Sequence, residues 1–183
     1  MAKKRLIMIS GGCRSGKSSF SQQLAEQVGQ KILYISTHSP FDSETREQVE
    51  DNKKLRPAHW DSMEQYLCIG DTLKEMGSKY DGIIIDCVTS LTRSILNDGW
   101  NDPMSKDSIL VLENRIVSEV ESILHSGYEG TLIIVTNELG LGMFPTTQMG
   151  RAFREVAGRL NHRVQLHAQE FYFMISGVPL RLK

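Results

Sequence analysis

Residues 6–18 read Leu-Ile-Met-Ile-Ser-Gly-Gly-Cys-Arg-Ser-Gly-Lys-Ser, an apolar run that leads directly into Gly11-x4-Gly16-Lys17-Ser18. This is the phosphate-binding loop pattern, in which a buried strand is followed by a glycine-rich turn and a helix. Glycines let the backbone turn tightly and point its N–H groups at an anion beside the helix N-terminus. The pattern predicts that Lys17 reaches the β- and γ-phosphates of a nucleoside triphosphate and that the Ser18 hydroxyl binds Mg²⁺. The alternative is a glycine-rich turn without a ligand.

Composition places the chain among ordinary globular proteins. Of 183 residues, 40 % are hydrophobic and 23 % charged, and the formal net charge is −1. This length allows one sizeable core, and no shift in composition or internal repeat divides it, so we expect a single domain over residues 1–183. The near-neutral charge argues against nucleic acid as the main partner.

The cysteines and the first residues bear on location. Cys13, Cys68 and Cys87 are isolated and show no CxxC spacing, which argues against a disulfide framework or a zinc site and fits a reducing compartment. The apolar stretch after the basic start is only about a strand long, too short for a signal peptide or a membrane span. We expect a cytoplasmic protein with no membrane span.

Apolar strands alternate with helical patterns along the whole chain. Near-continuous apolar runs are typical of parallel strands buried on both faces. The expected strands are 6–10, 31–36, 82–88, 131–136 and 170–176, and 179–183 is a possible sixth that pairs with the last as a hairpin. The expected helices are 17–28, 43–54, 61–76, 88–97, 107–125 and 150–168. The alternation predicts an α/β domain with a mostly parallel sheet flanked by helices.

Asp86 is the candidate for the second part of a phosphate-loop site. It follows Ile83-Ile84-Ile85 at the end of an expected strand. Ligands of open α/β sheets bind at the carboxyl ends of strands, where an acidic residue holds Mg²⁺ directly or through water. The alternative is that Asp86 is the N-cap of the helix that starts near Thr89.

Two further groups of residues leave alternatives open. Thr136-Asn137-Glu138 follows the strand 131–136 and is placed either to sense a γ-phosphate and position an acceptor hydroxyl, or to form a capped turn. Four arginines share one half of a helix and form either a solvated basic face or phosphate contacts across a subunit interface. These are Arg151, Arg154, Arg159 and Arg163. His59 is assigned no chemistry.

The chain resembles the bifunctional adenosylcobinamide kinase/adenosylcobinamide-phosphate guanylyltransferase family of cobalamin biosynthesis over essentially its whole length. The phosphate loop alone is shared by many families, whereas Arg56-Pro57-Ala58-His59-Trp60 and Thr136-Asn137-Glu138-x-Gly140-x-Gly142 are far more specific. Other matching blocks are Leu33-Tyr34-Ile35-Ser36-Thr37, Asp86-Cys87-Val88-Thr89, Phe153-Arg154-Glu155-x2-Gly158-Arg159-x-Asn161 and Ser176-Gly177-Val178.

The resemblance implies a RecA-like fold, a homotrimer and two reactions. The first phosphorylates the aminopropanol hydroxyl of adenosylcobinamide with ATP or GTP, and the second transfers GMP from GTP onto that phosphate through a guanylylated histidine. It implies catalytic roles for Lys17 and Asp86, with Glu138 expected to position the acceptor, and Mg²⁺ held by Ser18 and Asp86. The implied nucleotide contacts are Gly11, Gly12, Cys13, Arg14, Ser15, Gly16, Lys17, Ser18, Ser36, Thr37, His38, Asn52, Lys53, Lys54, Leu55, Glu64 and Asp86.

The chain departs from the family pattern at the second reaction. Asp51, followed by Asn52, stands where family members commonly carry the nucleophilic histidine, and Gln48 replaces the arginine before it. A carboxylate can form an acyl phosphate but is a poor substitute for a neutral imidazole. Three hypotheses follow: a bifunctional enzyme that uses another route, a kinase only, or a GTP-binding scaffold without catalysis.

Overall fold

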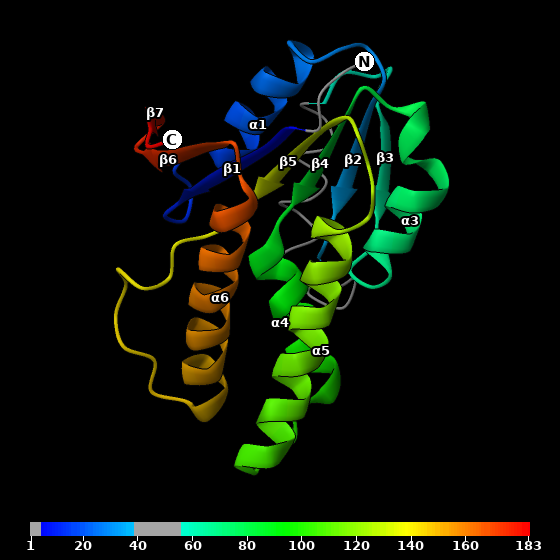
Figure 1. Ribbon diagram of the computed structural model, residues 1–183. Helices are drawn as coiled ribbons and strands as arrows, with labels where there is room; N and C mark the ends of the chain where they lie inside the picture. Colours follow the sequence, from blue (N-terminus) through cyan, green and yellow to red (C-terminus); the bar gives the residue numbers. More distant parts are fainter. Residues whose placement is uncertain (1–4, 39–55) are drawn as a thin grey trace.

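The computed structural model describes residues 5–38 and 56–183, and in this part of the chain a seven-stranded sheet forms the centre of the molecule (Figure 1). The strands are β1 (Arg5–Gly11), β2 (Ile32–Ser36), β3 (Asp61–Glu64), β4 (Gly82–Asp86), β5 (Thr131–Val135), β6 (Glu170–Ile175) and β7 (Val178–Arg181). Their order is β3-β2-β4-β5-β1-β6-β7. All neighbours pair in parallel except β6 and β7, which form an antiparallel hairpin. The expected α/β class is confirmed.

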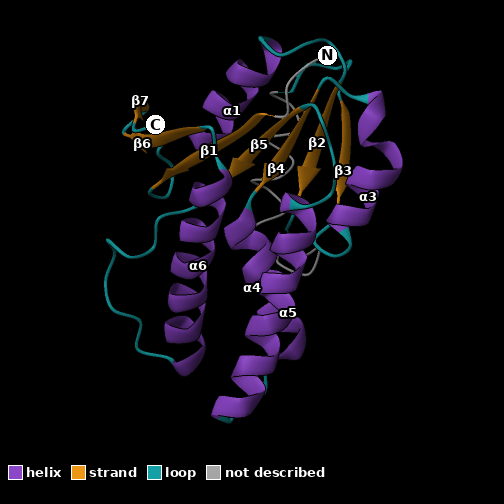
Figure 2. Ribbon diagram, in the orientation of Figure 1, coloured by secondary structure: helices purple, strands orange, loops and turns teal. Residues whose placement is uncertain are grey.

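Helices cover both faces of the sheet (Figure 2). They are α1 (Lys17–Glu26), α3 (Ile69–Met76), α4 (Val88–Gly99), α5 (Lys106–Leu124) and α6 (Gln148–His167), with a short 3₁₀ turn at Gly77–Lys79. Because successive side chains of a strand point to opposite faces of the sheet, each buried strand contributes side chains to two hydrophobic cores. Ile7, Ile9 and Ile84 pack on the α1 face with Ala25, whereas Met8, Ile35 and Ile85 pack against α3, α4, α5 and α6.

One expected helix is partly wrong. The segment 61–76 contains a strand, β3, whose residues pair with β2 from Leu33↔Asp61 to Ser36↔Glu64, and only Ile69–Met76 is helical. The strand Asp-Ser-Met-Glu lies at the edge of the sheet and is largely exposed, so it lacks the apolar run that marks a buried strand. The expected helix 43–54 lies outside the described residues. The sixth strand is confirmed as β7.

The topology brings the carboxyl ends of four parallel strands to one edge. β2, β4, β5 and β1 are adjacent, and they end at Ser36, Asp86, Val135 and Gly11. The phosphate loop therefore lies on the same edge as Asp86. None of the helices within residues 5–38 and 56–183 combines the length and the hydropathy of a membrane-spanning segment.

Candidate functional site

The phosphate loop joins β1 to α1 and is held against the β6–β7 hairpin. Gly16, the N-cap of α1, has φ 93°, a left-handed conformation that favours glycine. A Cβ on Gly11, whose φ is 151°, would lie 2.6 Å from the carbonyl oxygen of Met174. The Gly177 N–H donates to the Ser15 carbonyl at 3.0 Å. The shape of the phosphate loop is therefore fixed by a hairpin that is distant in the sequence. This contact gives a structural role to the block 176–178, which matches the family pattern together with the loop.

Lys17 is the first residue of α1 and is buried, with 8 % of its surface exposed. Its Nζ donates to the Gly12 carbonyl at 2.5 Å, so the ammonium lies against the loop's own backbone. Burial lowers the pKa of the Lys17 ammonium, while Cys87, Asp86 and Cys13 act in the opposite direction. The positive group therefore lies near Asp86, as a phosphate-loop site requires.

Asp86 ends β4 and is 7 % exposed. The N-cap of α4 is Cys87, whose Sγ accepts from the Ser90 N–H at 3.4 Å, so the capping alternative for Asp86 is wrong. Its carboxylate instead accepts a 2.5 Å hydrogen bond from the Tyr34 hydroxyl. Burial and the nearby Asp86 charge raise the pKa of Tyr34 well above its ordinary value, which keeps this donor protonated.

The oxygen donors at this edge fit a magnesium ion. Mg²⁺ prefers hard oxygen ligands and is usually bound by one or two protein groups, with waters and substrate phosphates completing the octahedron. Ser18 lies in the first turn of α1, next to Lys17, and supplies a hydroxyl, and Asp86 supplies a carboxylate. Within residues 5–38 and 56–183, no cluster of three or more His, Cys, Asp or Glu side chains forms a self-sufficient metal site. A site completed by the nucleotide is consistent with both observations.

Tyr34 and Arg56 are site residues to which sequence reasoning gave no role. The Arg56 guanidinium lies over the Tyr34 ring, 3.6 Å from its centroid, which is a favourable cation–π geometry. Its Nε and Nη1 atoms are buried and have no hydrogen-bond partner within residues 5–38 and 56–183. Buried, unsatisfied guanidinium N–H groups near the Tyr34–Asp86 pair are suited to donate hydrogen bonds to a phosphate oxygen. Both residues lie in blocks that carry the family resemblance, 33–37 and 56–60, but the blocks by themselves indicate no role for either side chain.

The end of β2 carries three of the expected nucleotide contacts. Thr37 is fully buried, and its hydroxyl donates to the Cys87 carbonyl at 2.6 Å and accepts from the Cys87 N–H at 2.8 Å. Ser36 Oγ lies 3.4 Å from His38 Nδ1, and His38 Nε2 lies 3.0 Å from Ser90 Oγ. The side chain of Thr37 thus joins β2 to the start of α4, whereas His38 lies at the site.

His38 is partly buried and lies among charged side chains. Burial lowers its pKa, with Asp86 and Glu64 acting against this and Arg93 and Arg56 acting with it. Glu64 is the last residue of β3 and pairs in register with Ser36. His38, Glu64 and the following residues 65–67 line a cavity of about 380 Å³ at this edge. The structure therefore brings the expected contacts His38 and Glu64 together with Asp86.

Thr136 and Asn137 form a buried hydrogen-bond network. Thr136 Oγ1 donates to Asn161 Oδ1 at 2.6 Å, and Asn161 Nδ2 donates to the Asn137 carbonyl at 3.0 Å. The Asn137 N–H donates to Thr89 Oγ1 at 2.7 Å. Glu138 accepts the Gly140 N–H at 2.7 Å, and its own N–H donates to the Gly11 carbonyl at 3.0 Å. This segment is therefore a structured turn that fastens the end of β5 to the phosphate loop.

Each of the four arginines of α6 has a partner within the chain. Arg151 Nη1 donates to the Thr146 carbonyl at 2.8 Å, and Arg154 Nη2 donates to the Gly140 carbonyl at 2.9 Å. Arg159 pairs with Glu113, and Arg163 pairs with Glu121 at 2.7 Å. The first two therefore hold the loop before α6, and the last two join α6 to α5.

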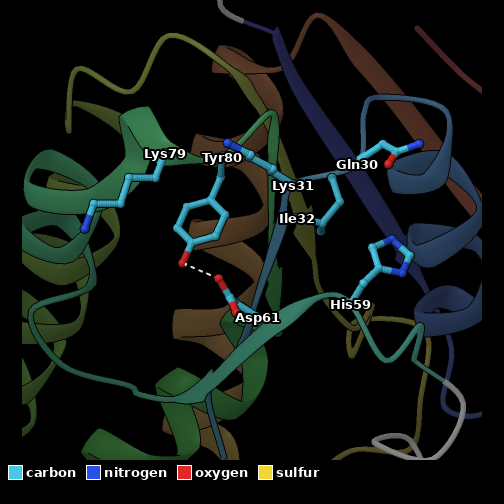
Figure 3. A pocket seen from close by; sticks show the side chains of 7 residues that line it. All are labelled: Gln30, Lys31, Ile32, His59, Asp61, Lys79 and Tyr80. Carbon is cyan, nitrogen blue, oxygen red and sulfur yellow. Dashed lines mark hydrogen bonds between the residues drawn. The ribbon is translucent and has the colours of Figure 1, made fainter.

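His59 lies away from the phosphate loop. Its side chain lines a cavity of about 280 Å³ at the amino ends of β2 and β3, together with Gln30, Lys31, Ile32, Asp61, Lys79 and Tyr80 (Figure 3). This is the edge of the sheet opposite the one at which β2 and β4 end. Asp51, Asn52, Lys53, Lys54 and Leu55 lie outside the described residues, so their expected roles stay predictions.

The comparisons with known proteins agree with this geometry. The family described as cobinamide kinase / cobinamide phosphate guanyltransferase matches residues 7–182. The bifunctional adenosylcobalamin biosynthesis protein CobU of Escherichia coli (strain K12) is 30 % identical over 182 residues, covering 97 % of this chain and 99 % of its own. The bifunctional adenosylcobalamin biosynthesis protein CobP of Pseudomonas aeruginosa is 32 % identical over 179 residues, covering 96 % of each chain.

Among solved structures, an ATPase from a bacterial type III secretion system has a similar fold. It matches with a TM-score of 0.54 at 12 % identity, covering 93 % of this chain and 52 % of the other. At this identity the likeness concerns the fold alone, and it confirms the expected RecA-like phosphate-loop architecture.

Proposed function

The chain belongs to the cobinamide kinase / cobinamide phosphate guanyltransferase family, and we propose that its phosphate loop performs the kinase reaction, with ATP or GTP as donor and the aminopropanol hydroxyl of adenosylcobinamide as acceptor. The observation that supports this most is the grouping of Lys17, Asp86 and Arg56 at one edge of the sheet, around a loop whose shape is fixed by β6. Two positive groups and one oriented carboxylate are suited to a phosphoryl group in transfer.

In the proposed reaction the acceptor oxygen attacks the γ-phosphorus, the bond to the β–γ bridging oxygen breaks, and the hydroxyl proton leaves to solvent or to a nearby base. Lys17 and Arg56 stabilise the negative charge that moves to the bridging and equatorial oxygens. Ser18 and Asp86 would hold Mg²⁺, which neutralises phosphate charge when bound. Tyr34 orients Asp86 through its 2.5 Å hydrogen bond. Glu138 stays our prediction for positioning the acceptor.

The expected contacts at the end of β2 support a nucleotide that extends from the loop toward β3. Ser36, His38 and Glu64 lie along this path, and the cavity beside them has room for part of a nucleoside. We assign these residues to nucleotide binding. Guanylyl transfer, the second activity of the family, is a separate question, because Asp51 occupies the position of the guanylylated histidine.

A homotrimer in the cytoplasm is the remaining part of the proposal. It is supported by the apolar side chains of the edge hairpin, where Ile175, Val178, Leu180 and Leu182 are each at least half exposed. A cluster of this kind on an edge strand favours contact with another chain. Cys13 and Cys68 are exposed free thiols, which fits a reducing compartment. Light scattering coupled to size-exclusion chromatography would give the mass of a trimer or refute it.

The kinase proposal is tested with Lys17→Ala and γ-labelled GTP or ATP plus adenosylcobinamide. We expect transfer of label to the corrinoid to be abolished while circular dichroism shows a folded protein. The matched control is Lys74→Ala, which removes an exposed lysine paired with Asp71 on α3 and should leave transfer unchanged. Undiminished transfer in Lys17→Ala would overturn the assignment.

A further inference from the structure

The segment that leads from β5 to α6 presents large apolar side chains to solvent. We call residues 139–147 the apolar loop. Leu141 is 81 % exposed, Met143 95 % and Phe144 73 %. Three large apolar side chains exposed within four residues exceed the scattered single exposures that are normal at a protein surface, and such groups are typical of binding surfaces.

Polar contacts fix the backbone of the apolar loop and leave these side chains outside. Arg154 donates to the Gly140 carbonyl at 2.9 Å, and Arg151 donates to the Thr146 carbonyl at 2.8 Å. The Gly142 N–H donates to the Leu139 carbonyl at 3.3 Å. Arg154 also lies 5.7 Å from the centroid of the Phe144 ring. Two arginines of α6 are thus committed to holding a loop whose apolar side chains contribute little to the core.

The apolar loop begins one residue after a contact with the phosphate loop. The Glu138 N–H donates to the Gly11 carbonyl at 3.0 Å, immediately before the apolar loop starts. At about 3.5 Å per residue of extended chain, Leu141 lies within roughly 10 Å of that contact and Phe144 within roughly 20 Å. Figure 1 shows the segment (yellow) running outside α6, beginning at the carboxyl end of β5.

We propose that the apolar loop binds the corrin ring of the acceptor; this rests on the proposed kinase function. The corrin of cobinamide is a broad macrocycle whose rim carries methyl groups as well as amide side chains, and its aminopropanol group stands at the end of one of these flexible side chains. When the hydroxyl of that group lies at the γ-phosphate, the ring remains outside the nucleotide site, one side-chain length away. An ordered apolar surface beginning beside Gly11 lies within this reach.

A second copy of the chain is the rival occupant of this surface. The β6–β7 hairpin and the residue after it already offer Ile175, Val178, Leu180 and Leu182 for a contact between subunits, at the edge of the sheet that β7 forms. The apolar loop instead follows directly on Glu138, whose N–H donates to the phosphate loop, where the acceptor must approach. Proximity to the reacting phosphate therefore favours the corrinoid.

The test measures binding of adenosylcobinamide by equilibrium dialysis in wild type, Leu141→Ser and Phe144→Ser. Each variant should bind the corrinoid at least about fivefold more weakly and show the same rise in KM, because apolar area no longer leaves water on binding. The affinity for GTP should stay unchanged. Val111→Ser is the matched control, since Val111 on α5 is 68 % exposed and should have no effect.

A second measurement uses the unmodified protein. Met143 is almost fully exposed, so peroxide should oxidise it quickly, and saturating adenosylcobinamide should slow this oxidation several-fold by mass spectrometry. Unchanged corrinoid affinity in both serine variants, or unprotected Met143, would overturn the inference. Dissociation of the oligomer in the serine variants would also overturn it, in favour of a subunit contact. If wild-type protein fails to phosphorylate adenosylcobinamide at all, the proposed function itself falls.

Discussion

The hydrogen bond from Tyr34 to Asp86 gives the sharpest prediction of the structure. Tyr34 is 1 % exposed, its hydroxyl donates to the Asp86 carboxylate at 2.5 Å, and its ring lies under Arg56. Tyr34→Phe removes the hydroxyl alone and keeps the ring, so Arg56 retains its contact. The substitution therefore isolates the support that this donor gives to the carboxylate.

The size of the effect follows from burial. A hydrogen bond to a charged, buried group contributes about 1.5–3 kcal/mol, and Tyr34→Phe should lower the free energy of unfolding by that amount. For a chain of this length each kcal/mol corresponds to about 2–4 °C, so Tm should fall by about 3–12 °C. Loss of a partner that orients a metal ligand typically costs about 10–100-fold, and we expect the half-saturating Mg²⁺ concentration of phosphoryl transfer to rise within that range.

The assay compares Tyr34→Phe with Tyr80→Phe. Tyr80 also donates to a carboxylate, Asp61, at 2.8 Å, but this pair lies exposed at the opposite edge of the sheet (Figure 3). Thermal unfolding and a Mg²⁺ titration of γ-phosphoryl transfer are measured for both. If the two variants show the same small changes, the assignment of Asp86 as an oriented metal ligand is refuted.

Three further predictions concern other parts of the site. Because burial lowers the pKa of His38, the unfolded chain binds a proton near pH 6.5 that the folded chain does not, so stability should fall as the pH drops below about 6.5. The difference between the urea unfolding midpoints at pH 5 and pH 7.5 should therefore be smaller in His38→Asn than in wild type. An identical difference in the two proteins would contradict this. Thr136→Val keeps the shape but leaves the buried Asn161 Oδ1 without its donor, so urea unfolding should show a loss of about 1–3 kcal/mol, whereas no loss would mean that the network is not needed. Arg163→Ala breaks only an exposed pair with Glu121 and should cost less than about 1 kcal/mol with unchanged kinase activity; a large fall in kcat would restore the phosphate-contact interpretation of this arginine.

Much of the fold could be predicted from the sequence because its signals are local. The four apolar runs of β1, β2, β4 and β5 are buried parallel strands, and the phosphate loop lies between a strand and a helix as its pattern requires. β3 was missed because it is short, polar and at an edge, and its strand conformation comes from pairing with β2 rather than from its own residues. The helical assignment of 61–64 failed for this reason.

Only those residues of the site that a local sequence signal marks could be predicted. Lys17 and Asp86 were identified because a motif and a strand end mark them. Tyr34, Arg56 and Gly177 act through contacts between segments that are distant in sequence, such as the 2.5 Å bond across 52 positions from Tyr34 to Asp86. No local pattern reports such a contact. The four arginines of α6 show that a shared helix face does not imply a shared role. The first two donate to the loop before α6, and the last two form ion pairs with α5.

The kinase proposal is tested most directly by a side-by-side assay of wild-type protein with γ-labelled and α-labelled GTP, each with adenosylcobinamide. We expect the γ-label to appear in the corrinoid and this transfer to require Mg²⁺. Appearance of the α-label in protein or corrinoid would show that guanylyl transfer survives with Asp51 at the histidine position. Absence of γ-label from the corrinoid, with GTP bound but unchanged, would refute the kinase proposal and identify the protein as a nucleotide-binding scaffold.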